Sequence, residues 1–143
     1  MHRLRSVLQR QRIVSAPPDA MVHAVAVIMT RSHVGAVPIV EAERLVGIFS
    51  ERDLMSRVVV PNRDPHTTPV SEVMTTQVVT ATPQEHVDYC VEKMKRVGCR
   101  HLPVVVDEKV IGMVSMRDLL RDELSEQDDE IRGLKAYMHQ TPI

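Results

Sequence analysis

The sequence predicts an α+β fold made of two β-α-β-β-α repeats, which we expect to pack against each other about a pseudo-two-fold axis. The first observation is an internal repeat, because residues 14–59 align without a gap on residues 79–124. The second is the helical spacing of apolar residues, which recurs at the matching positions of both copies. The third is a pair of strand-like segments after each helix. A period this long with only two copies indicates two units that cover each other's apolar faces, not a solenoid.

Both copies predict the same order of elements. A short β segment leads through a proline-marked turn into an amphipathic helix, which two strands rich in β-branched residues and then a second helix follow. The turns between the paired strands are short and charged, so each pair is expected to form a hairpin. In the first copy these elements are 13–15, 19–32, 36–40, 45–49 and a helix from Ser50; in the second they are 78–80, 84–97, 102–106, 110–114 and a helix from Ser115.

The repeats set the expected domain boundaries at 5–60 and 70–125. Residues 61–69 contain three prolines and are expected to form a linker without regular structure. A short N-terminal helix with Leu4 inward has its counterpart at 70–74, where Ser6 aligns with Ser71. Residues 126–143 form the expected C-terminal helical tail.

Composition excludes several classes of function. The net charge of −1 and the presence of only three aromatic residues argue against nucleic-acid binding. Apolar runs are too short to span a bilayer, so we expect no membrane segment and a cytoplasmic protein with two reduced cysteines. The seven histidines lack metal-site spacing, and no nucleophile or carboxylate pair suggests catalysis. We therefore expect a non-enzymatic protein that holds no metal and requires no cofactor.

The strongest local signal is a duplicated heptapeptide, Gly47–Asp53 and Gly112–Asp118. Each heptapeptide ends a strand in serine and places an aspartate three residues later, in the first helical turn. One interpretation is structural, with the serine as the N-cap and the aspartate completing a capping box. The other is functional, because a helix N-terminus and a serine hydroxyl suit a phosphate while the carboxylate suits the hydroxyls of a ribose. Arg52 and Arg117 could then reach phosphate oxygens.

With these motifs the chain resembles the tandem cystathionine-β-synthase (CBS) pair, or Bateman module, and in particular the stand-alone bacterial two-CBS signalling proteins. The resemblance is carried by the repeat itself, the two heptapeptides and the hydrophobic-proline pairs Val37-Pro38 and Leu102-Pro103. It implies a sensor that binds AMP, ADP, ATP or an NAD-type ligand in the cleft between the repeats. The alternative is an interaction scaffold of the same fold, with no adenylate ligand or a different small one.

The resemblance also implies roles for individual residues. Asp53 and Asp118 would hold ribose hydroxyls, and Ser50 and Ser115 would hold phosphate. The two hydrophobic-proline pairs and the residues just before each pair would line adenine or phosphate, and polar residues near each linker would close the clefts. The first group is Gly35, Ala36, Arg100 and His101; the second is Ser71 and Thr76, with Ser6 and Gln11 as their counterparts. Because Gly35-Ala36 stands where the second copy has Arg100-His101, the two sites are expected to be unequal. The site beside Arg100 and His101 is expected to bind the more anionic ligand.

Assembly is predicted from the first long helix. Besides its core stripe it carries a second apolar set, whereas the matching residues in the second copy are mostly polar. A helix that is apolar nearly all round should be buried on both sides, so we expect a homodimer through Met21, Ala24, Val27 and Ile28, and the resemblance implies such pairing too. The alternative is that the C-terminal helix, through Ile131, Leu134 and Met138, covers this face within one chain. An unidentified regulated protein is a further expected partner.

Overall fold

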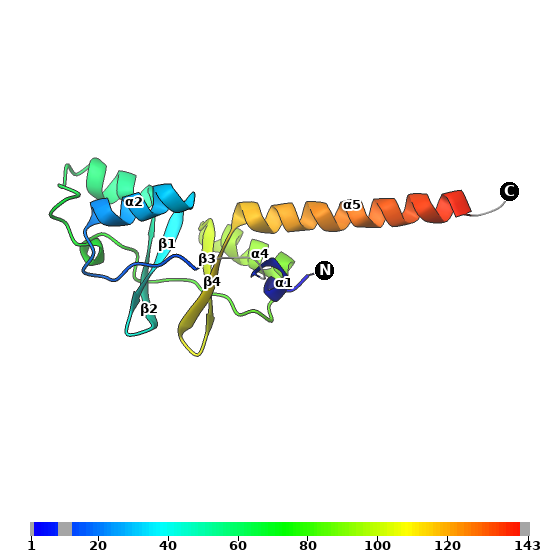
Figure 1. Ribbon diagram of the computed structural model, residues 1–143, viewed down its shortest axis with the longest axis horizontal. Helices are drawn as coiled ribbons and strands as arrows, with labels where there is room; N and C mark the ends of the chain where they lie inside the picture. Colours follow the sequence, from blue (N-terminus) through cyan, green and yellow to red (C-terminus); the bar gives the residue numbers. More distant parts are fainter. Residues whose placement is uncertain (1, 9–12, 141–143) are drawn as a thin grey trace.

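The computed structural model describes residues 2–8 and 13–140, and it contains two hairpins joined into one four-stranded antiparallel sheet (Figure 1). Strands β1 (Ala36–Glu41) and β2 (Arg44–Ser50) form the first hairpin, and β3 (His101–Val106) and β4 (Lys109–Ser115) form the second. The strand order is β1-β2-β4-β3, and the pair Arg44 and Lys109 joins the two hairpins. The predicted hairpins are confirmed.

Each hairpin turns through two residues in the left-handed region. Ala42 and Glu43 have φ of 50° and 67°, and Asp107 and Glu108 have φ of 51° and 67°. Two consecutive positive φ angles match the right-handed twist of hairpin strands. The equal geometry of the two turns reflects the internal repeat, although neither turn contains glycine.

The helices follow the predicted order with some differences. Helices α2 (Val22–Ser32) and α4 (Val87–Val97) begin three residues later than predicted. After Ser50 a short helix, α3 (Glu51–Asp53), continues as the π-helical segment η1 (Leu54–Val59). In the second copy the matching helix does not stop: α5 runs from Met116 to Gln140 as one helix. The expected separate C-terminal helix is therefore the extension of the second repeat's own last helix.

The predicted β segments 13–15 and 78–80 are not strands. Each is reduced to a single parallel bridge one residue later, at Ala16 with Ile39 and at Ala81 with Val104. Two hydrogen bonds hold each bridge; for example, the Ala16 N–H donates to Pro38 and the Val40 N–H donates to Ala16. Pro17 and Pro83 follow closely, and because proline has no N–H to donate, pairing ends there.

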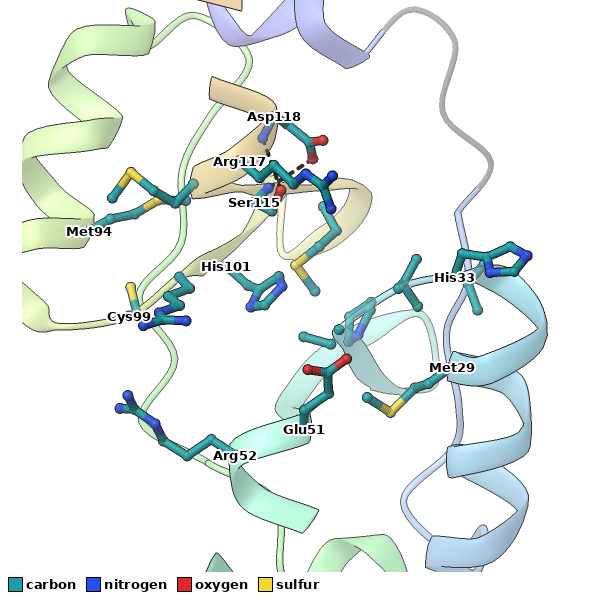
Figure 2. Close-up of a pocket in the computed structure, with 18 of the residues that line it drawn as sticks. Met29, His33, Glu51, Arg52, Met94, Cys99, His101, Ser115, Arg117 and Asp118 are labelled. Carbon is teal, nitrogen blue, oxygen red and sulfur yellow. Dashed lines mark hydrogen bonds between the residues drawn. The ribbon is translucent and has the colours of Figure 1, made fainter. Parts of the chain in front are cut away.

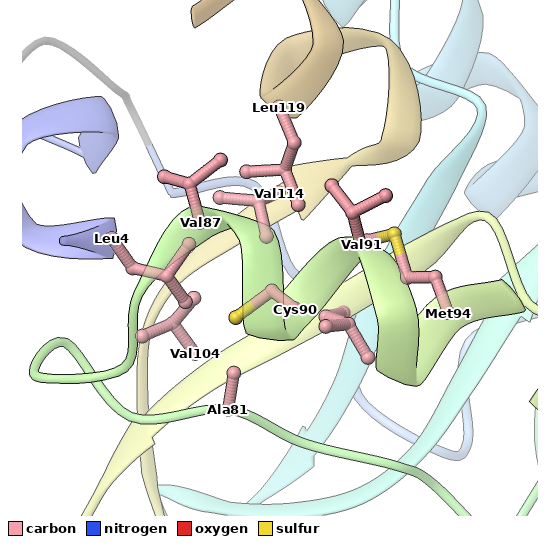
Figure 3. Close-up of a cluster of buried hydrophobic side chains, with 10 residues drawn as sticks. Leu4, Ala81, Val87, Cys90, Val91, Met94, Val104, Val114 and Leu119 are labelled. Atoms are coloured by element: carbon pink, nitrogen blue, oxygen red, sulfur yellow. The ribbon is translucent and has the colours of Figure 1, made fainter. Parts of the chain in front are cut away.

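Two hydrophobic cores lie side by side, one per repeat, and each receives a short helix from outside its own β-α-β-β-α unit. In the second repeat, Leu4 of α1 (Leu4–Leu8) is fully buried against Val87, Cys90 and Val104 (Figure 3). In the first repeat, Val70 and Val73, in and just after η2 (Val70–Glu72), fill the corresponding place. The N-terminal helix thus completes the second repeat, and the segment after the linker completes the first.

The far end of α5 leaves the body of the protein and projects as a lone helix (Figure 1). Ile131, Leu134 and Met138 are 49%, 64% and 72% exposed. The alternative in which the C-terminal helix covers the second face of α2 is therefore wrong for this chain. Met21, the N-cap of α2, and Ala24 are exposed and Val27 is half-buried, whereas Ile28 packs against the first core.

Candidate functional site

A cleft of about 1490 Å³ lies between the two repeats, on the side of the helices. Residues from α2, α3, the start of β1, the end of α4 and the start of α5 line it. Figure 2 shows Arg117, Asp118 and His101 on one side of this space, with Glu51 and Met29 facing them from the first repeat. The site is therefore assembled from both copies.

The structure brings most of the predicted second-copy residues into this cleft. Arg100, His101, Ser115, Arg117 and Asp118 all line it. The first copy contributes Gly35, Ala36, Pro38 and Arg52, but Ser50 and Asp53 do not line it. The glycine-alanine pair and the arginine-histidine pair were expected in two separate clefts. Instead they face each other, since a Cβ atom at Gly35 would lie 3.3 Å from Nε2 of His101.

The remaining predicted site residues lie elsewhere. Val37 and Leu102 are fully buried core residues, because alternate side chains of a strand point to opposite faces. Pro103 is buried but does not line the cleft. Ser71, Thr76 and Ser6 are exposed and lie outside it, and Gln11 lies outside the described residues.

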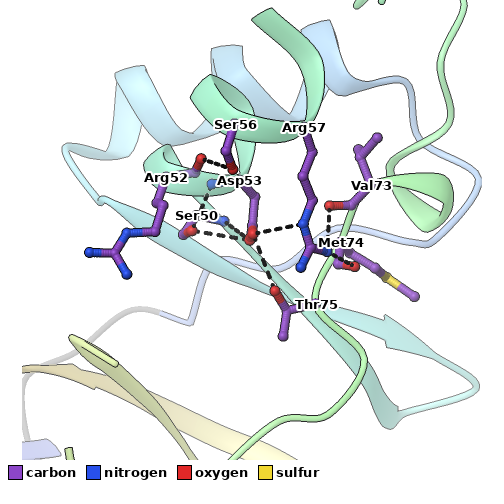
Figure 4. Close-up of polar contacts among 8 residues, drawn as sticks. All are labelled: Ser50, Arg52, Asp53, Ser56, Arg57, Val73, Met74 and Thr75. Atoms are coloured by element: carbon purple, nitrogen blue, oxygen red, sulfur yellow. Dashed lines mark hydrogen bonds and ion pairs between the residues drawn. The ribbon is translucent and has the colours of Figure 1, made fainter. Parts of the chain in front are cut away.

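In the first repeat, the duplicated motif is used for structure (Figure 4). Oδ2 of Asp53 accepts hydrogen bonds from the Ser50 N–H and hydroxyl, both at 3.0 Å, and the Asp53 N–H donates back to the serine Oγ at 3.2 Å. The Thr75 hydroxyl donates to Oδ1 at 3.2 Å, and Nε of Arg57 lies 3.7 Å from the same oxygen. Both oxygens of Asp53 are therefore engaged within the protein, and its side chain is 6% exposed and does not line the cleft. The linker-side residue that reaches it is Thr75, not the predicted Thr76.

In the second repeat, the same motif leaves its carboxylate available. The Ser115 N–H donates to Oδ2 of Asp118 at 3.0 Å, and the Asp118 N–H donates to Ser115 Oγ at 3.0 Å. Within residues 2–8 and 13–140 no side chain bonds Oδ1. Of the two side chains that engage Oδ1 of Asp53, Arg57 is matched by Asp122, another acid, and Thr75 is matched by Arg10, which lies outside the described residues. Asp122 contacts His2 instead, with its Oδ1 3.0 Å from Nδ1 of the imidazole.

The cleft is rich in positive charge. Two carboxylates, Glu51 and Asp118, line it together with five basic side chains, and none of the five makes an ion pair with another described residue. An excess of cations in a concave site attracts anionic ligands. Two of the five cations, Lys95 and Arg121, were not predicted from the sequence as site residues, and neither was the acid Glu51. The one signal for Arg121 was its position one helical turn after Arg117. The five basic residues are Arg52, Lys95, Arg100, Arg117 and Arg121.

His101 occupies the middle of the cleft (Figure 2). Burial lowers the pKa of this imidazole; Glu51 and Asp118 act in the opposite direction, and Arg100 adds to the lowering. The neutral form is therefore favoured near neutral pH. A neutral imidazole can accept or donate one hydrogen bond, as the edge of a purine or a hydroxyl requires.

Apolar groups complete the walls. The thioethers of Met29 and Met94 lie on the two repeats, and Leu120 and Leu124 of α5 extend the wall outward. Flexible, polarizable methionine side chains can pack against flat aromatic groups. The cleft thus offers apolar packing, one free carboxylate oxygen and several cations.

Comparison with known proteins agrees with this architecture. The family model for the CBS domain matches residues 4–60 and 70–125. The chain is 36% identical over 115 residues to the mitochondrial CBS domain-containing protein CBSX3 of Arabidopsis thaliana, covering 77% of this chain but only 56% of that protein. It is 31% identical over 116 residues to the CBS domain-containing protein YhcV of Bacillus subtilis, covering 81% of this chain and 82% of that one.

Two similar solved structures contain ligands. The CBS domain pair of protein MJ0100, in complex with 5′-methylthioadenosine and S-adenosyl-L-methionine, has a TM-score of 0.80 and 26% identity, over 88% of this chain and 98% of that one. A CBS domain protein of Pyrobaculum aerophilum complexed with AMP has a TM-score of 0.74 and 28% identity, over 81% and 88%. No helix within the described part of the chain is long and apolar enough to cross a membrane.

Proposed function

Because the chain belongs to the CBS-domain family, we propose that it is a regulatory module that binds an adenine nucleotide in the cleft between its repeats. The ligand is AMP, ADP, ATP or an NAD-type molecule, and the module senses its concentration without catalysis. The observation that carries the proposal is Oδ1 of Asp118, which accepts no hydrogen bond from a described residue and lies beside cleft arginines that form no ion pair within the same part of the chain. A carboxylate next to cations accepts ribose hydroxyls while the cations hold phosphate.

The contacts of the second motif support an orientation for this ligand. Asp118 and Ser115 sit at the N-terminus of α5, where the helix dipole favours a phosphate or a hydroxyl-rich sugar. Arg117 and Arg100 then approach the phosphate, and His101 with the methionine walls packs against the base. The first repeat contributes Arg52 and the wall around Gly35, so a single nucleotide contacts both repeats.

A test of the proposal begins with ligand-dependent stability. The chain is heated with AMP, ADP, ATP, NAD, NADH or S-adenosylmethionine, with inosine and free phosphate as controls for the base and the anion. A ligand at 100 times its Kd stabilises the folded state by about 2.7 kcal/mol. A shift of the melting temperature with one adenine compound supports the proposal. If none of these compounds shifts it, the interaction-scaffold alternative is favoured.

We also propose the predicted homodimer through α2. Met21, Ala24 and Val27 support it as the exposed or half-exposed part of that face. Ile28 contributes less than the sequence suggested, because it packs in its own core. A regulated protein and a cytoplasmic location complete the proposed setting.

A further inference from the structure

The exposed apolar residues of α5 repeat with the spacing of a coiled coil. They follow one another at alternating intervals of four and three positions, which keeps them on one side of a helix. Five of the six are apolar, with exposures between 44% and 72%, and one is a glutamine. We call this stripe the α5 seam: Leu120, Leu124, Gln127, Ile131, Leu134 and Met138.

The seam needs a partner for physical reasons. Leu119 points into the second core and is fully buried, so the seam lies on a different face of the same helix from the one that packs on the body. Residues 127–138 are all exposed, and this end of the helix projects from the body (Figure 1). Isolated helices of this length are marginal in water. Gly133, around whose Cβ position nothing lies within 4 Å, lowers the helix propensity further.

We propose that the projecting part of α5 pairs with α5 of a second copy as a short antiparallel coiled coil. In heptad terms Leu124, Ile131 and Met138 are a positions, and Gln127 and Leu134 are d positions. An antiparallel pair that sets Ile131 opposite Leu134 of the second copy overlaps residues 127–138. The two bodies then stand at opposite ends, because each attaches before residue 126.

Charge decides between the two orientations. Residues flanking a coiled-coil seam set partner choice and orientation through ion pairs. In the antiparallel register, Asp128 faces Lys135 of the second copy, and by symmetry this attractive pair occurs twice. In a parallel in-register pair, Glu123 would face Asp128 of the second copy, and this repulsion cancels the attraction between Glu130 and Lys135. The antiparallel arrangement therefore has the better charge complementarity.

A second copy fits better than an unrelated protein because the complementarity lies within one sequence. A two-fold interface requires each surface to match itself, and the Asp128–Lys135 pairing meets this requirement. The seam is also separate from the α2 face, so the two proposed contacts can be tested one at a time.

The test is self-association of the full chain without nucleotide, measured by sedimentation equilibrium over a range of concentrations. Ile131→Glu/Leu134→Glu should weaken association by about a hundredfold or more, because two buried apolar side chains per copy are lost. The matched control, Arg132→Glu/Ala136→Glu, adds the same groups on the opposite face and should leave association unchanged. A wild-type chain that is monomeric throughout overturns the proposal. So does a wild-type chain that forms nothing larger than a dimer, if that dimer survives the seam variant and is lost with Val27→Glu.

Orientation is tested by charge reversal. In the antiparallel pair Asp128→Lys sets lysine against lysine and should weaken association several-fold, while Asp128→Lys/Lys135→Asp should restore it. In a parallel pair Asp128→Lys would relieve repulsion with Glu123 and strengthen association. Stronger association of the single variant therefore overturns the antiparallel arrangement. Melting curves that match the wild type confirm that the body of each variant is folded.

Discussion

The two aspartates of the duplicated motif should respond in opposite ways to the same substitution. Asp53→Asn should destabilise the fold and leave nucleotide affinity nearly unchanged. Asp118→Asn should leave the fold nearly intact and weaken the nucleotide. The reason is the contrast in their contacts: both oxygens of Asp53 are engaged within the protein, whereas Asp118 lines the cleft and its Oδ1 accepts no hydrogen bond from a described residue.

The magnitudes follow from those contacts. In Asp53→Asn, the Arg57 ion pair is lost and at least one oxygen acceptor becomes an amide donor facing Ser50 or Thr75. Hydrogen bonds to a charged group contribute about 1.5–3 kcal/mol each, so a loss of about 2–3 kcal/mol of unfolding free energy is expected. In a chain of this size that lowers the melting temperature by roughly 5–10 °C. In Asp118→Asn, the loss of a charge-assisted contact to ribose costs about tenfold or more in affinity.

The assay pairs urea denaturation of the free protein with isothermal titration of the best ligand from the thermal screen. Ser50→Ala and Ser115→Ala are matched controls, because each removes the N-cap hydroxyl from one motif and keeps the aspartate. Both should cost about 1 kcal/mol of stability, as N-cap losses do. If Asp53→Asn abolishes binding in a folded protein while Asp118→Asn binds normally, the assignment of the two motifs is wrong.

Three further predictions concern other parts of the molecule. Burial lowers the pKa of His101, so an anionic ligand should bind more tightly as pH falls through that pKa, because the imidazole becomes positively charged. The stability that the neutral histidine contributes is lost over the same pH range. His101→Gln should flatten the dependence of ligand affinity on pH, and an unchanged pH dependence would exclude His101 from the site. Gly47→Ala should cost about 1–3 kcal/mol of stability in urea denaturation by overpacking, since its Cβ would lie 2.5 Å from Sδ of Met74; wild-type stability would contradict this close approach. Burial and the hydrogen bond to Glu85 raise the pKa of the Cys90 thiol to about 12, so a thiol reagent at pH 8 should leave it unmodified until urea unfolds the chain, and rapid native labelling at Cys90 would contradict its burial.

Much of the fold could be predicted because the repeat supplied two independent copies of every signal. The helices that pack on the hairpins keep their apolar spacing in both copies, and this spacing fixed which faces are buried, as at Val25 and Cys90. The exchange of short helices between the two cores was not predicted. The apolar residues Leu4 and Val70 indicate that each short helix buries one face. A short apolar segment does not show which of the two repeats it packs against.

The candidate site was only partly predictable for a related reason. Sequence identity between Asp53 and Asp118 suggested equal roles, whereas their roles depend on neighbours brought in from elsewhere. Arg57, one turn later, and Thr75, from the segment after the linker, engage the first aspartate. The substitution of Asp122 at the position matching Arg57 is the signal in the sequence that separates the two aspartates, and its meaning depends on helical geometry.

The most direct test of the account is the number of adenine nucleotides bound per chain. A cleft shared by both repeats, with one aspartate available, predicts a single high-affinity site per chain in isothermal titration calorimetry. The same titration on Asp118→Asn should show an affinity reduced by about tenfold or more. Two equal sites per chain, or a single site that Asp118→Asn leaves unchanged, would contradict the account.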